Sequence, residues 1–452
     1  MVPEMNLFTL EFNKTKSKSE QIAEAIASDI NDKRLKKNDK LPSKRILANH
    51  LGISLNTVIN AYELLLSEGY IYSIEKKGYY VSNNILIKNT SNQAIKPKSE
   101  EINSFSYSFK TSNVDSSLIP ASNLKKIYDE VLKNNNYLYK TDFSGEESLK
   151  NAICQYLYEV KGIKANPCDI IISSGIDTLI PQIIKLINAS IIAIEDPGYK
   201  KVANIINYTN KKIIYQKIDN EGITIPTQNV NLIYTTPYSQ FPLGIKMSNQ
   251  RKNELIAYTK RNNSYIIEDS FDSDFTLKPF ITSSLYSMSD NVFYIESFSR
   301  SIAPSFRISF MILPSKLTSQ YKKLHLGFSN PVSTIDQLVL AKYISTSFFK
   351  HINHLRTILR KKREIILQNI DLNIFEILYQ ESYLAIIVRP KYIPQNIKEL
   401  LLNNKIEISF ISDFMYKETS NLLMIGYSYI SINDIKDGIL LLNQIFTPKK
   451  DE

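Results

Sequence analysis

Apolar residues in the first part of the chain, residues 1–82, recur at helical spacing in three successive stretches. The third stretch, 55–68, is the clearest, because Val58, Tyr62 and Leu65 fall on one face. This spacing predicts three amphipathic helices that each bury one side. After them, two short runs rich in tyrosine, isoleucine and valine predict a β-hairpin.

Serine and glycine residues mark the ends of these predicted helices. Ser19, Ser43 and Ser54 each precede a helical stretch, where a serine hydroxyl can accept a hydrogen bond from a free backbone N–H group. Gly52 lies between the second and third stretches and Gly69 follows the third, which predicts a tight turn and a helix end. Two short helices joined by a glycine turn and followed by a hairpin are typical of a winged helix-turn-helix.

The pattern changes after a polar segment without clear period, 83–104, which we interpret as a linker. In residues 105–452, short β-branched runs alternate with helical stretches, for example DIIISSG, SIIAIED and SYIIED. This alternation predicts an α/β domain with a mainly parallel sheet that is covered on both faces. After Val332, a long helical region leads to two further strands and a final helix, which predict a smaller C-terminal lobe.

Composition narrows the class of protein. Of the 452 residues, 43% are apolar and 22% are charged, which is typical of a globular protein and excludes a disordered one. The sequence has only two cysteines and four histidines, so neither a disulfide framework nor a Cys/His metal site is expected. It also has only 12 glycines, too few for a glycine-rich linker or repeat. It contains no apolar stretch of about 18 residues and no signal-peptide core, so we expect a soluble cytoplasmic protein without a membrane partner.

Positive charge gathers between the first and second predicted helices. The formal net charge is +10, and residues 33–45 hold seven lysines and arginines against one aspartate, a local excess of 7 − 1 = +6. Such a run can neutralise DNA phosphates, while asparagine and threonine on a recognition helix can read bases. The alternative is a protein-interaction module whose lysines face solvent. The predicted DNA-binding residues are Ser43, Lys44, Arg45, Ser54, Asn56, Thr57, Asn60, Lys76, Lys77 and Gly78.

One segment resembles the signature of GntR-family regulators: it reads LPSKRILANHLGISLNTVINAYELLLSEGYI and lies within residues 19–82. In that family the arginine of LPSxR, here Arg45, and the start of the third helix contact DNA, so the resemblance implies a double-stranded DNA operator as partner. Two positions depart from the family pattern. Leu55 stands where a basic residue usually follows the capping serine, and Asn60 stands at a position that is often arginine. These departures predict weaker phosphate anchoring and an altered base preference.

The larger part of the chain carries a second resemblance. The motifs ISSGIDTLI, IEDPGY, IIEDSFDSDF and ESFSRSIAPSFRISF occur in the order found in fold-type I aminotransferases. Together with the GntR-like segment, they make the chain similar to regulators of the MocR subfamily, which are usually dimers. The resemblance implies a pyridoxal phosphate site in which Asp269 pairs with the pyridine nitrogen, Tyr199 stacks on the ring and Arg307 binds the phosphate. The implied cofactor-binding residues are Ser174, Gly175, Tyr199, Asp269, Ser297, Ser299, Arg300 and Arg307.

Four departures fall within this implied cofactor site. Arg300 stands where the family has the lysine that forms the Schiff base, and a guanidinium stays protonated and cannot do this chemistry. Phe271 replaces a tyrosine, Met424 replaces an arginine that binds the substrate carboxylate, and Asp177 replaces a glutamine near the phosphate. The resemblance therefore implies no catalytic residue, and pyridoxal phosphate is either lost or bound without a covalent bond.

Three functions remain open at the level of sequence. The leading hypothesis is a MocR-type transcriptional regulator, a homodimer whose aminotransferase-like domain senses an unidentified small molecule. The second is a pyridoxal phosphate-dependent aminotransferase with an appended DNA-binding domain, against which Arg300 and Met424 argue. The third is a scaffold that no longer binds DNA, which Leu55 and Asn60 leave open.

Overall fold

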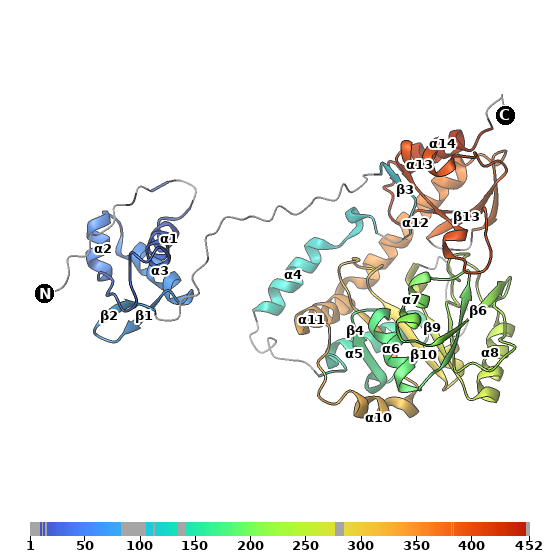
Figure 1. Ribbon diagram of the computed structural model, residues 1–452, viewed down its shortest axis with the longest axis horizontal. Coiled ribbons are helices and arrows are strands. Elements are labelled where there is room, and N and C mark those ends of the chain that lie inside the picture. Colours follow the sequence, from blue (N-terminus) through green and yellow to red (C-terminus); the bar gives the residue numbers. More distant parts are fainter. Residues whose placement is uncertain are drawn as a thin grey trace. The chain divides into compact units, whose positions relative to one another are not determined.

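The computed structural model describes residues 10, 12–13, 16–82, 105–111, 114–133, 142–275, 284–380, 382 and 384–448. The chain forms two compact units, Met1–Ile102 and Asn103–Glu452 (Figure 1). The predicted linker, 83–104, lies outside the described residues. In the part of the chain that the structure describes, no helix is long and apolar enough to cross a membrane.

The smaller unit has the predicted three helices and a two-stranded hairpin. Ile22, Ile26, Val58, Tyr62 and Leu65 are completely buried, so the apolar faces that the sequence predicts form the core of this unit. The first strand of the hairpin extends to Ile74 and the second begins at Gly78, so residues 75–77 form the turn between them. The elements are α1 (Lys18–Asn31), α2 (Lys44–Leu51), α3 (Leu55–Ser67), β1 (Ile71–Ile74) and β2 (Gly78–Val81).

Serine caps begin all three helices of this unit. The prediction for α1 is wrong, because Ser17 and not Ser19 is the cap: its hydroxyl accepts from the Glu20 N–H at 3.3 Å. The Glu20 carboxylate accepts in return from the Ser17 N–H at 2.9 Å, and this reciprocal capping box fixes the helix start. Ser43 and Ser54 cap α2 and α3 as predicted, at N–H to oxygen distances of 3.3 and 3.2 Å.

The segment before α2 pairs with the two-stranded hairpin through one isolated β-bridge. It runs antiparallel to β2 through a bridge between Lys40 and Tyr80, and the Leu41 N–H donates to the Tyr79 carbonyl at 2.9 Å. The sequence did not predict this pairing, because the segment is short and charged and has no period of its own. The end of the cationic run is therefore attached to the wing.

The larger unit is built on an eight-stranded sheet with the strand order β4-β11-β10-β9-β8-β5-β6-β7. Neighbouring strands from β10 to β6 are parallel, while β11 and β7 are antiparallel to their neighbours, which confirms the predicted mainly parallel sheet. The strands are β4 (Ile170–Ser173), β5 (Ile191–Asp196), β6 (Lys212–Asp219), β7 (Gly222–Ile223), β8 (Leu232–Thr235), β9 (Tyr265–Asp269), β10 (Val292–Ser297) and β11 (Ser309–Ile312).

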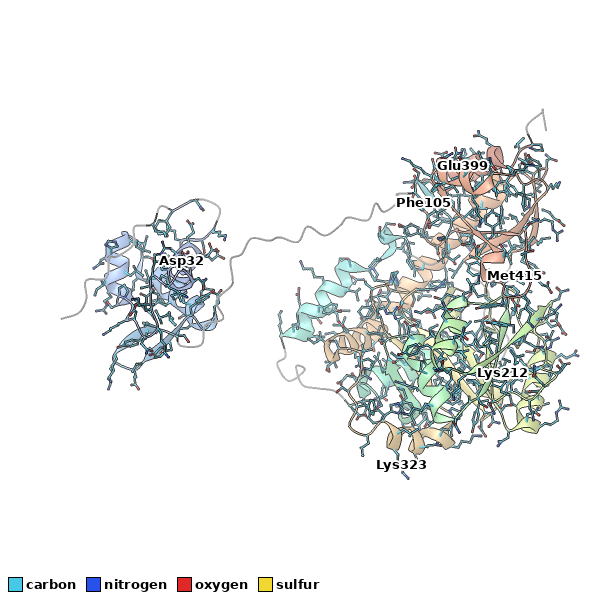
Figure 2. The ribbon with its side chains drawn as sticks, in the orientation of Figure 1. Asp32, Phe105, Lys212, Lys323, Glu399 and Met415 are labelled. Atoms are coloured by element: carbon cyan, nitrogen blue, oxygen red, sulfur yellow. The ribbon has the colours of Figure 1, made fainter. Side chains whose placement is uncertain are left out.

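Successive side chains of these strands pack into two different apolar layers. In β4, Ile170 and Ile172 belong to one buried cluster and Ile171 to another. Burial on both faces explains why such strands read as continuous apolar runs. Figure 2 shows the side chains that fill the layers between the sheet and its helices. The helices of this part are α4 (Ala121–Leu132), α5 (Glu147–Lys161), α6 (Ile176–Leu186), α7 (Lys200–Tyr208), α8 (Asn249–Asn262), α9 (Leu285–Met288) and α10 (Ser315–Leu324).

The predicted long helical region consists of α11 (Thr334–Tyr343), a π-helical segment (Ile344–Phe348) and α12 (Phe349–Asn369). It leads into the predicted smaller lobe, whose antiparallel sheet has the order β12-β13-β16-β15. β3 (Tyr107–Ser108) pairs in parallel with β14 (Ile406–Glu407), so the start of the unit is attached to this lobe. The other elements are β12 (Phe375–Tyr379), β13 (Ala385–Pro390), α13 (Ile397–Asn403), β15 (Ser409–Phe410), β16 (Leu423–Gly426) and α14 (Ile435–Ile445).

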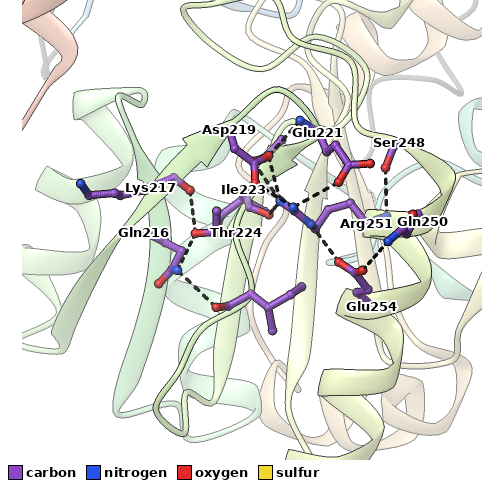
Figure 3. A network of polar contacts seen from close by, with 12 residues as sticks. Gln216, Lys217, Asp219, Glu221, Ile223, Thr224, Ser248, Gln250, Arg251 and Glu254 are labelled. Carbon is purple, nitrogen blue, oxygen red and sulfur yellow. Dashed lines mark hydrogen bonds and ion pairs between the residues drawn. The ribbon is translucent and has the colours of Figure 1, made fainter.

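One arginine on α8 fixes the edge of the large sheet (Figure 3). The Arg251 guanidinium lies 2.8 Å from an Asp219 carboxylate oxygen and 3.1 Å from Glu254. It also donates to the Ile223 carbonyl at 2.7 Å, and its side chain is only 8% exposed. Charge-assisted hydrogen bonds are stronger than neutral ones, so this network holds the β6–β7 hairpin against α8.

Candidate functional site

The predicted recognition helix presents two asparagines to solvent. Asn56 and Asn60 lie about one turn apart in the first half of α3, and both side chains are exposed. Thr57 is half-buried, and its hydroxyl lies 2.8 Å from the Ser54 hydroxyl within the helix cap. The two asparagines are therefore free to meet a base edge, while Ser54 and Thr57 stabilise the start of the helix.

Exposed basic side chains occur on α2 and on the wing of the same unit. Arg45 is exposed in the first turn of α2. Lys76 and Lys77 are exposed in the turn between β1 and β2. In winged helices these are places where the protein meets the DNA backbone, and a cation there can neutralise a phosphate.

Other predicted DNA contacts are engaged within the unit itself. The Lys44 ammonium lies 4.8 Å from the centre of the Tyr79 ring, a cation–π contact. Ser43 serves as the α2 cap. Gly78 has a φ of +115°, which residues with a side chain rarely adopt, and a methyl group there would lie 3.3 Å from Lys40 Cε. These residues shape the unit, and the sequence pattern does not separate that role from DNA contact.

The cationic run 33–45 is less positive in its surroundings than its own sequence indicates. The Arg34 guanidinium lies 2.8 Å from Asp29 and 2.9 Å from Asp32, two carboxylates that precede the run. Including these partners lowers the local excess from +6 to 7 − 3 = +4. The difference arises because the C-terminal end of α1 brings its acidic residues beside the run.

Replacing Ser54 by alanine should separate the two roles of this residue. Because its hydroxyl caps α3, we expect a loss of about 1 kcal/mol in local helix stability. Hydrogen–deuterium exchange of the full chain should then be faster in peptides from 55–67. Ser54→Gly is the matched control and should exchange almost as the wild type does, since glycine is a good N-cap. Unchanged exchange together with weaker DNA binding would instead make Ser54 a DNA contact.

The larger unit contains a cavity of about 510 Å³ at the carboxyl ends of its parallel strands. Asp269 ends β9, Ser297 ends β10 and Tyr199 follows β5, and all three line the cavity. This edge of a parallel sheet is where ligands commonly bind. Ser174 does not line the cavity, unlike the other predicted residues. Those that line it are Gly175, Tyr199, Asp269, Ser297, Ser299, Arg300 and Arg307.

Asp269 is buried and accepts a hydrogen bond from within the protein. The Tyr234 hydroxyl donates to Asp269 Oδ2 at 2.5 Å. Burial raises the pKa of Asp269 to about 6, against the opposite effects of the Tyr234 hydrogen bond and of Arg300. Burial likewise raises the pKa of Asp272 to about 7. Both carboxyl groups therefore take up a proton more readily than an exposed aspartate.

Arg300 lines the cavity from the segment between β10 and β11. Its guanidinium carbon lies 4.9 Å from the centre of the Phe271 ring, a cation–π contact. Among the described residues, no carboxylate oxygen lies within 4 Å of this guanidinium. Burial lowers the pKa of Arg300, but a guanidinium remains protonated at neutral pH. A cation in this position can bind the anionic group of a ligand.

Two serines, a glycine and an arginine form another part of the cavity wall. The Ser297 hydroxyl donates to Ser299 Oγ at 3.2 Å, and the Ser299 hydroxyl donates to the Phe306 carbonyl at 3.2 Å. Gly175 has a φ of +139° just before α6, and a methyl group there would lie 2.9 Å from Arg307 Nη2. Arg307 can pack across this backbone because residue 175 is glycine.

Asp177 pairs with two cations in the same part of the cavity. Its carboxylate lies 3.1 Å from Arg307 Nη2 and 2.5 Å from Lys201 Nζ. Burial alone would raise the pKa of Asp177, but Lys201 and Arg307 outweigh it and hold the pKa below its ordinary value. Sequence reasoning missed Lys201, because a lysine at the start of a helix usually faces solvent and no motif marks this one.

Aromatic side chains line the remaining space. We call Tyr199, Phe241, Phe271 and Phe414 the aromatic wall, because all four line the cavity. The Phe241 ring lies edge-on to the other three, at centre-to-centre distances of 5.6, 6.1 and 4.9 Å. Such edge-to-face contacts are favourable for aromatic pairs. Sequence reasoning did not predict Phe414, which lies in the C-terminal lobe outside every motif.

Comparison with known proteins assigns both units to families. Residues 18–81 match the model of bacterial regulatory proteins of the gntR family, and residues 108–412 match that of class I and II aminotransferases. The chain is 34% identical over 426 residues to YdeL of Bacillus subtilis (strain 168), an uncharacterized HTH-type transcriptional regulator, covering 90% of this chain and 92% of that protein. It is also 25% identical over 372 residues to MocR of Rhizobium meliloti, a probable rhizopine catabolism regulatory protein. That match covers 76% of this chain and 75% of MocR. The chain belongs to the MocR-type transcriptional regulators of the GntR family.

The aminotransferase-like unit of this MocR-type regulator also matches solved structures. The structure of an archaeal alanine:glyoxylate aminotransferase superimposes with a TM-score of 0.65 at 21% identity. The match covers 75% of this chain and 90% of that one. At this identity the likeness shows the fold alone, and it confirms the fold-type I aminotransferase fold that the sequence implies.

Proposed function

We propose that this MocR-type regulator is a cytoplasmic DNA-binding homodimer whose aminotransferase-like unit senses a small molecule without forming an internal aldimine. The observation that carries the proposal is the combination, in one chain, of exposed Asn56 and Asn60 on α3 with a cavity that contains Arg300. A ligand in that cavity would regulate transcription by binding one arrangement of the units better than another.

Operator binding is tested with the full chain and the DNA upstream of its own gene. Fluorescence anisotropy should show binding to this duplex at least about 10³-fold tighter than to a duplex of the same composition in scrambled order. The exposed asparagines support this expectation, because an asparagine amide can bond adenine through two hydrogen bonds. Equal binding to both duplexes at low salt would support the scaffold hypothesis instead.

The residues of the cavity do not fit covalently held pyridoxal phosphate. This cofactor supplies an electron sink when it is bound in the aminotransferase fold. Arg300 has no amine that could form an imine with its aldehyde, and Phe271 offers no hydroxyl to a ring oxygen. Asp177 already forms ion pairs with Arg307, an implied phosphate ligand, and with Lys201, which lines the same cavity.

Absorbance provides the test of the missing aldimine. Adding pyridoxal phosphate to the purified protein is expected to give no absorbance between about 390 and 430 nm beyond that of the same concentration of free cofactor, because additional absorbance there requires a lysine imine. Borohydride treatment should fix no label on a lysine of this site. Release of a keto acid from common amino donors would establish the aminotransferase hypothesis instead.

Native mass measurement tests the homodimer. We expect a species of twice the 51.9 kDa chain mass, because aminotransferase-like regulators are usually dimers and two winged helices read two half-sites. A monomer at micromolar concentration would contradict this part of the proposal.

A further inference from the structure

The implied phosphate site of the cavity already contains an anion of this chain. The Asp177 carboxylate is shared between Arg307 at 3.1 Å and Lys201 at 2.5 Å. The single carboxylate of Asp177, in the first turn of α6, therefore offsets one of these two positive charges. A phosphorylated ligand would have to displace Asp177 or lie beside its negative charge, and both lower affinity.

Arg300 is in a different situation. Its guanidinium rests on the Phe271 ring, and no carboxylate oxygen of a described residue lies within 4 Å of it. Asp269 and Asp272 lie in the same region, but burial raises their pKa values to about 6 and 7. Neither carboxyl group forms an ion pair with Arg300 within 4 Å, and Asp269 accepts a hydrogen bond from the Tyr234 hydroxyl instead.

Aromatic and other apolar side chains form part of the cavity that holds Arg300. The aromatic wall and Met424 of β16 line the cavity together with this arginine. The cavity volume of about 510 Å³ is within the range of sites for small organic molecules. Aromatic side chains around such a space favour a flat apolar group. Lys110, Lys201 and Arg307 also line the cavity, but each pairs with a carboxylate, whereas Arg300 has no such pair among the described residues and so favours a ligand with one negative charge.

We infer that the cavity binds an aromatic monocarboxylate without a phosphate group, whose carboxylate pairs with Arg300 and whose ring packs against the aromatic wall. Asp177 acts in this arrangement as an internal counter-ion that closes the implied phosphate site. The inference rests on the proposed function, because it names the class of small molecule that the regulator would sense. Binding is non-covalent and requires no cofactor.

Indole-3-acetate is a suitable probe because the chain contains no tryptophan, so indole fluorescence reports the ligand alone. Tryptophol carries the same ring with a neutral hydroxyl in place of the carboxylate. We expect the full-length protein to bind indole-3-acetate about 10- to 100-fold more tightly than tryptophol, the usual effect of a charge-assisted hydrogen bond. Equal affinity for the two probes would overturn the inference.

Substitutions at Arg300 test which cation is responsible. Arg300→Met should bind both probes with the affinity of the wild type for tryptophol, and Arg300→Lys should keep part of the preference. Arg300→Gln carries the same expectation as the methionine variant and serves if that variant does not fold. Arg389→Met, at an exposed arginine of β13, is the matched control and should keep the full preference. A preference that survives in Arg300→Met or Arg300→Gln would contradict the assignment.

Asp177→Asn tests the internal counter-ion. The substitution frees Arg307 and Lys201 at nearly constant volume, so we expect affinity for pyridoxal phosphate to rise about tenfold or more. The affinity for indole-3-acetate should stay at the wild-type value, because that probe binds elsewhere in the cavity. An unchanged affinity for pyridoxal phosphate would overturn the role of Asp177.

Operator binding by the same preparations separates this inference from the proposed function. If the regulator binds its operator but does not distinguish the two indole probes, the inferred class of ligand is wrong and the proposed function as a DNA-binding regulator is retained. If it distinguishes the probes but binds no operator, the inference stands for the cavity and the proposed function fails.

Discussion

Replacing Lys161 by methionine is expected to destabilise the larger unit by about 3–5 kcal/mol, the usual cost of removing one partner of a buried ion pair. The Lys161 ammonium, in the last turn of α5, lies 2.5 Å from a Glu296 carboxylate oxygen. It also lies 2.7 Å from the Ser273 hydroxyl and 3.4 Å from Asp274. No charged side chain of this group is more than 7% exposed. Methionine would leave both carboxylates without their cation.

The loss of stability should grow as the pH rises. Burial raises the pKa of Glu296 in the folded protein, while Lys161 opposes this effect. Without the lysine, the folded-state pKa moves further above the unfolded value, so the folded state binds more protons than the unfolded state. Stability then falls with rising pH. We therefore expect a larger difference from the wild type at about pH 8 than at about pH 5.

Urea denaturation followed by near-ultraviolet circular dichroism of the tyrosines would measure this effect. Lys164→Met is the matched control, because Lys164 is exposed three residues further along, and it should change stability by less than about 0.5 kcal/mol. Combining Lys161→Met with Glu296→Gln should recover part of the loss, since one uncompensated charge is removed. A cost below about 1 kcal/mol for Lys161→Met would show that this group behaves like a surface pair.

Local sequence patterns predict most of the elements correctly because their boundaries carry local signals. The strand Tyr265–Asp269 begins with the apolar residues Tyr265, Ile266 and Ile267 and is buried on both faces, and such a start between polar segments leaves few alternatives. Gly52 marks the helix-turn-helix turn with a φ of +62°. The exception is the start of α1, where Ser17 and Ser19 both satisfy the rule for a cap. Only the reciprocal bond with Glu20 selects the first of them.

No local signal in the sequence predicts the contacts between residues that lie far apart along the chain. Lys161 resembles an ordinary lysine in the last turn of a helix, and nothing near it in the sequence indicates a partner 135 residues later. Asp177 meets Lys201 and Arg307 only because the fold brings three separate segments to one sheet edge. The candidate cofactor residues came from a family resemblance rather than from a local pattern. The family pattern does not indicate which partners are contacted by residues, such as Asp177, that replace the usual family residue.

The double variant Arg45→Ala, Lys77→Ala is expected to lower the affinity of the full-length regulator for its operator about 10- to 100-fold at physiological salt. Arg45 is exposed on α2 and Lys77 is exposed in the turn of the wing. Each phosphate contact releases counterions from DNA. A homodimer of this variant loses two contacts in each protomer, four in all, so the plot of log affinity against log salt should become shallower by about 3.6. Anisotropy titrations at several salt concentrations would measure both quantities.

The contrast with Asn56→Ala decides whether these residues have different roles. If the exposed Asn56 amide contacts a base edge, its removal should weaken binding to the operator by about 1–3 kcal/mol. Binding to other DNA and the salt slope should stay unchanged. Lys322→Ala, at an exposed lysine of α10 in the larger unit, is the matched control and should change neither quantity. A wild-type salt slope in the double variant would mean that Arg45 and Lys77 do not face the phosphates. The DNA-binding surface would then have to lie on another face of the winged helix, where the remaining lysines of the cationic run are the next candidates.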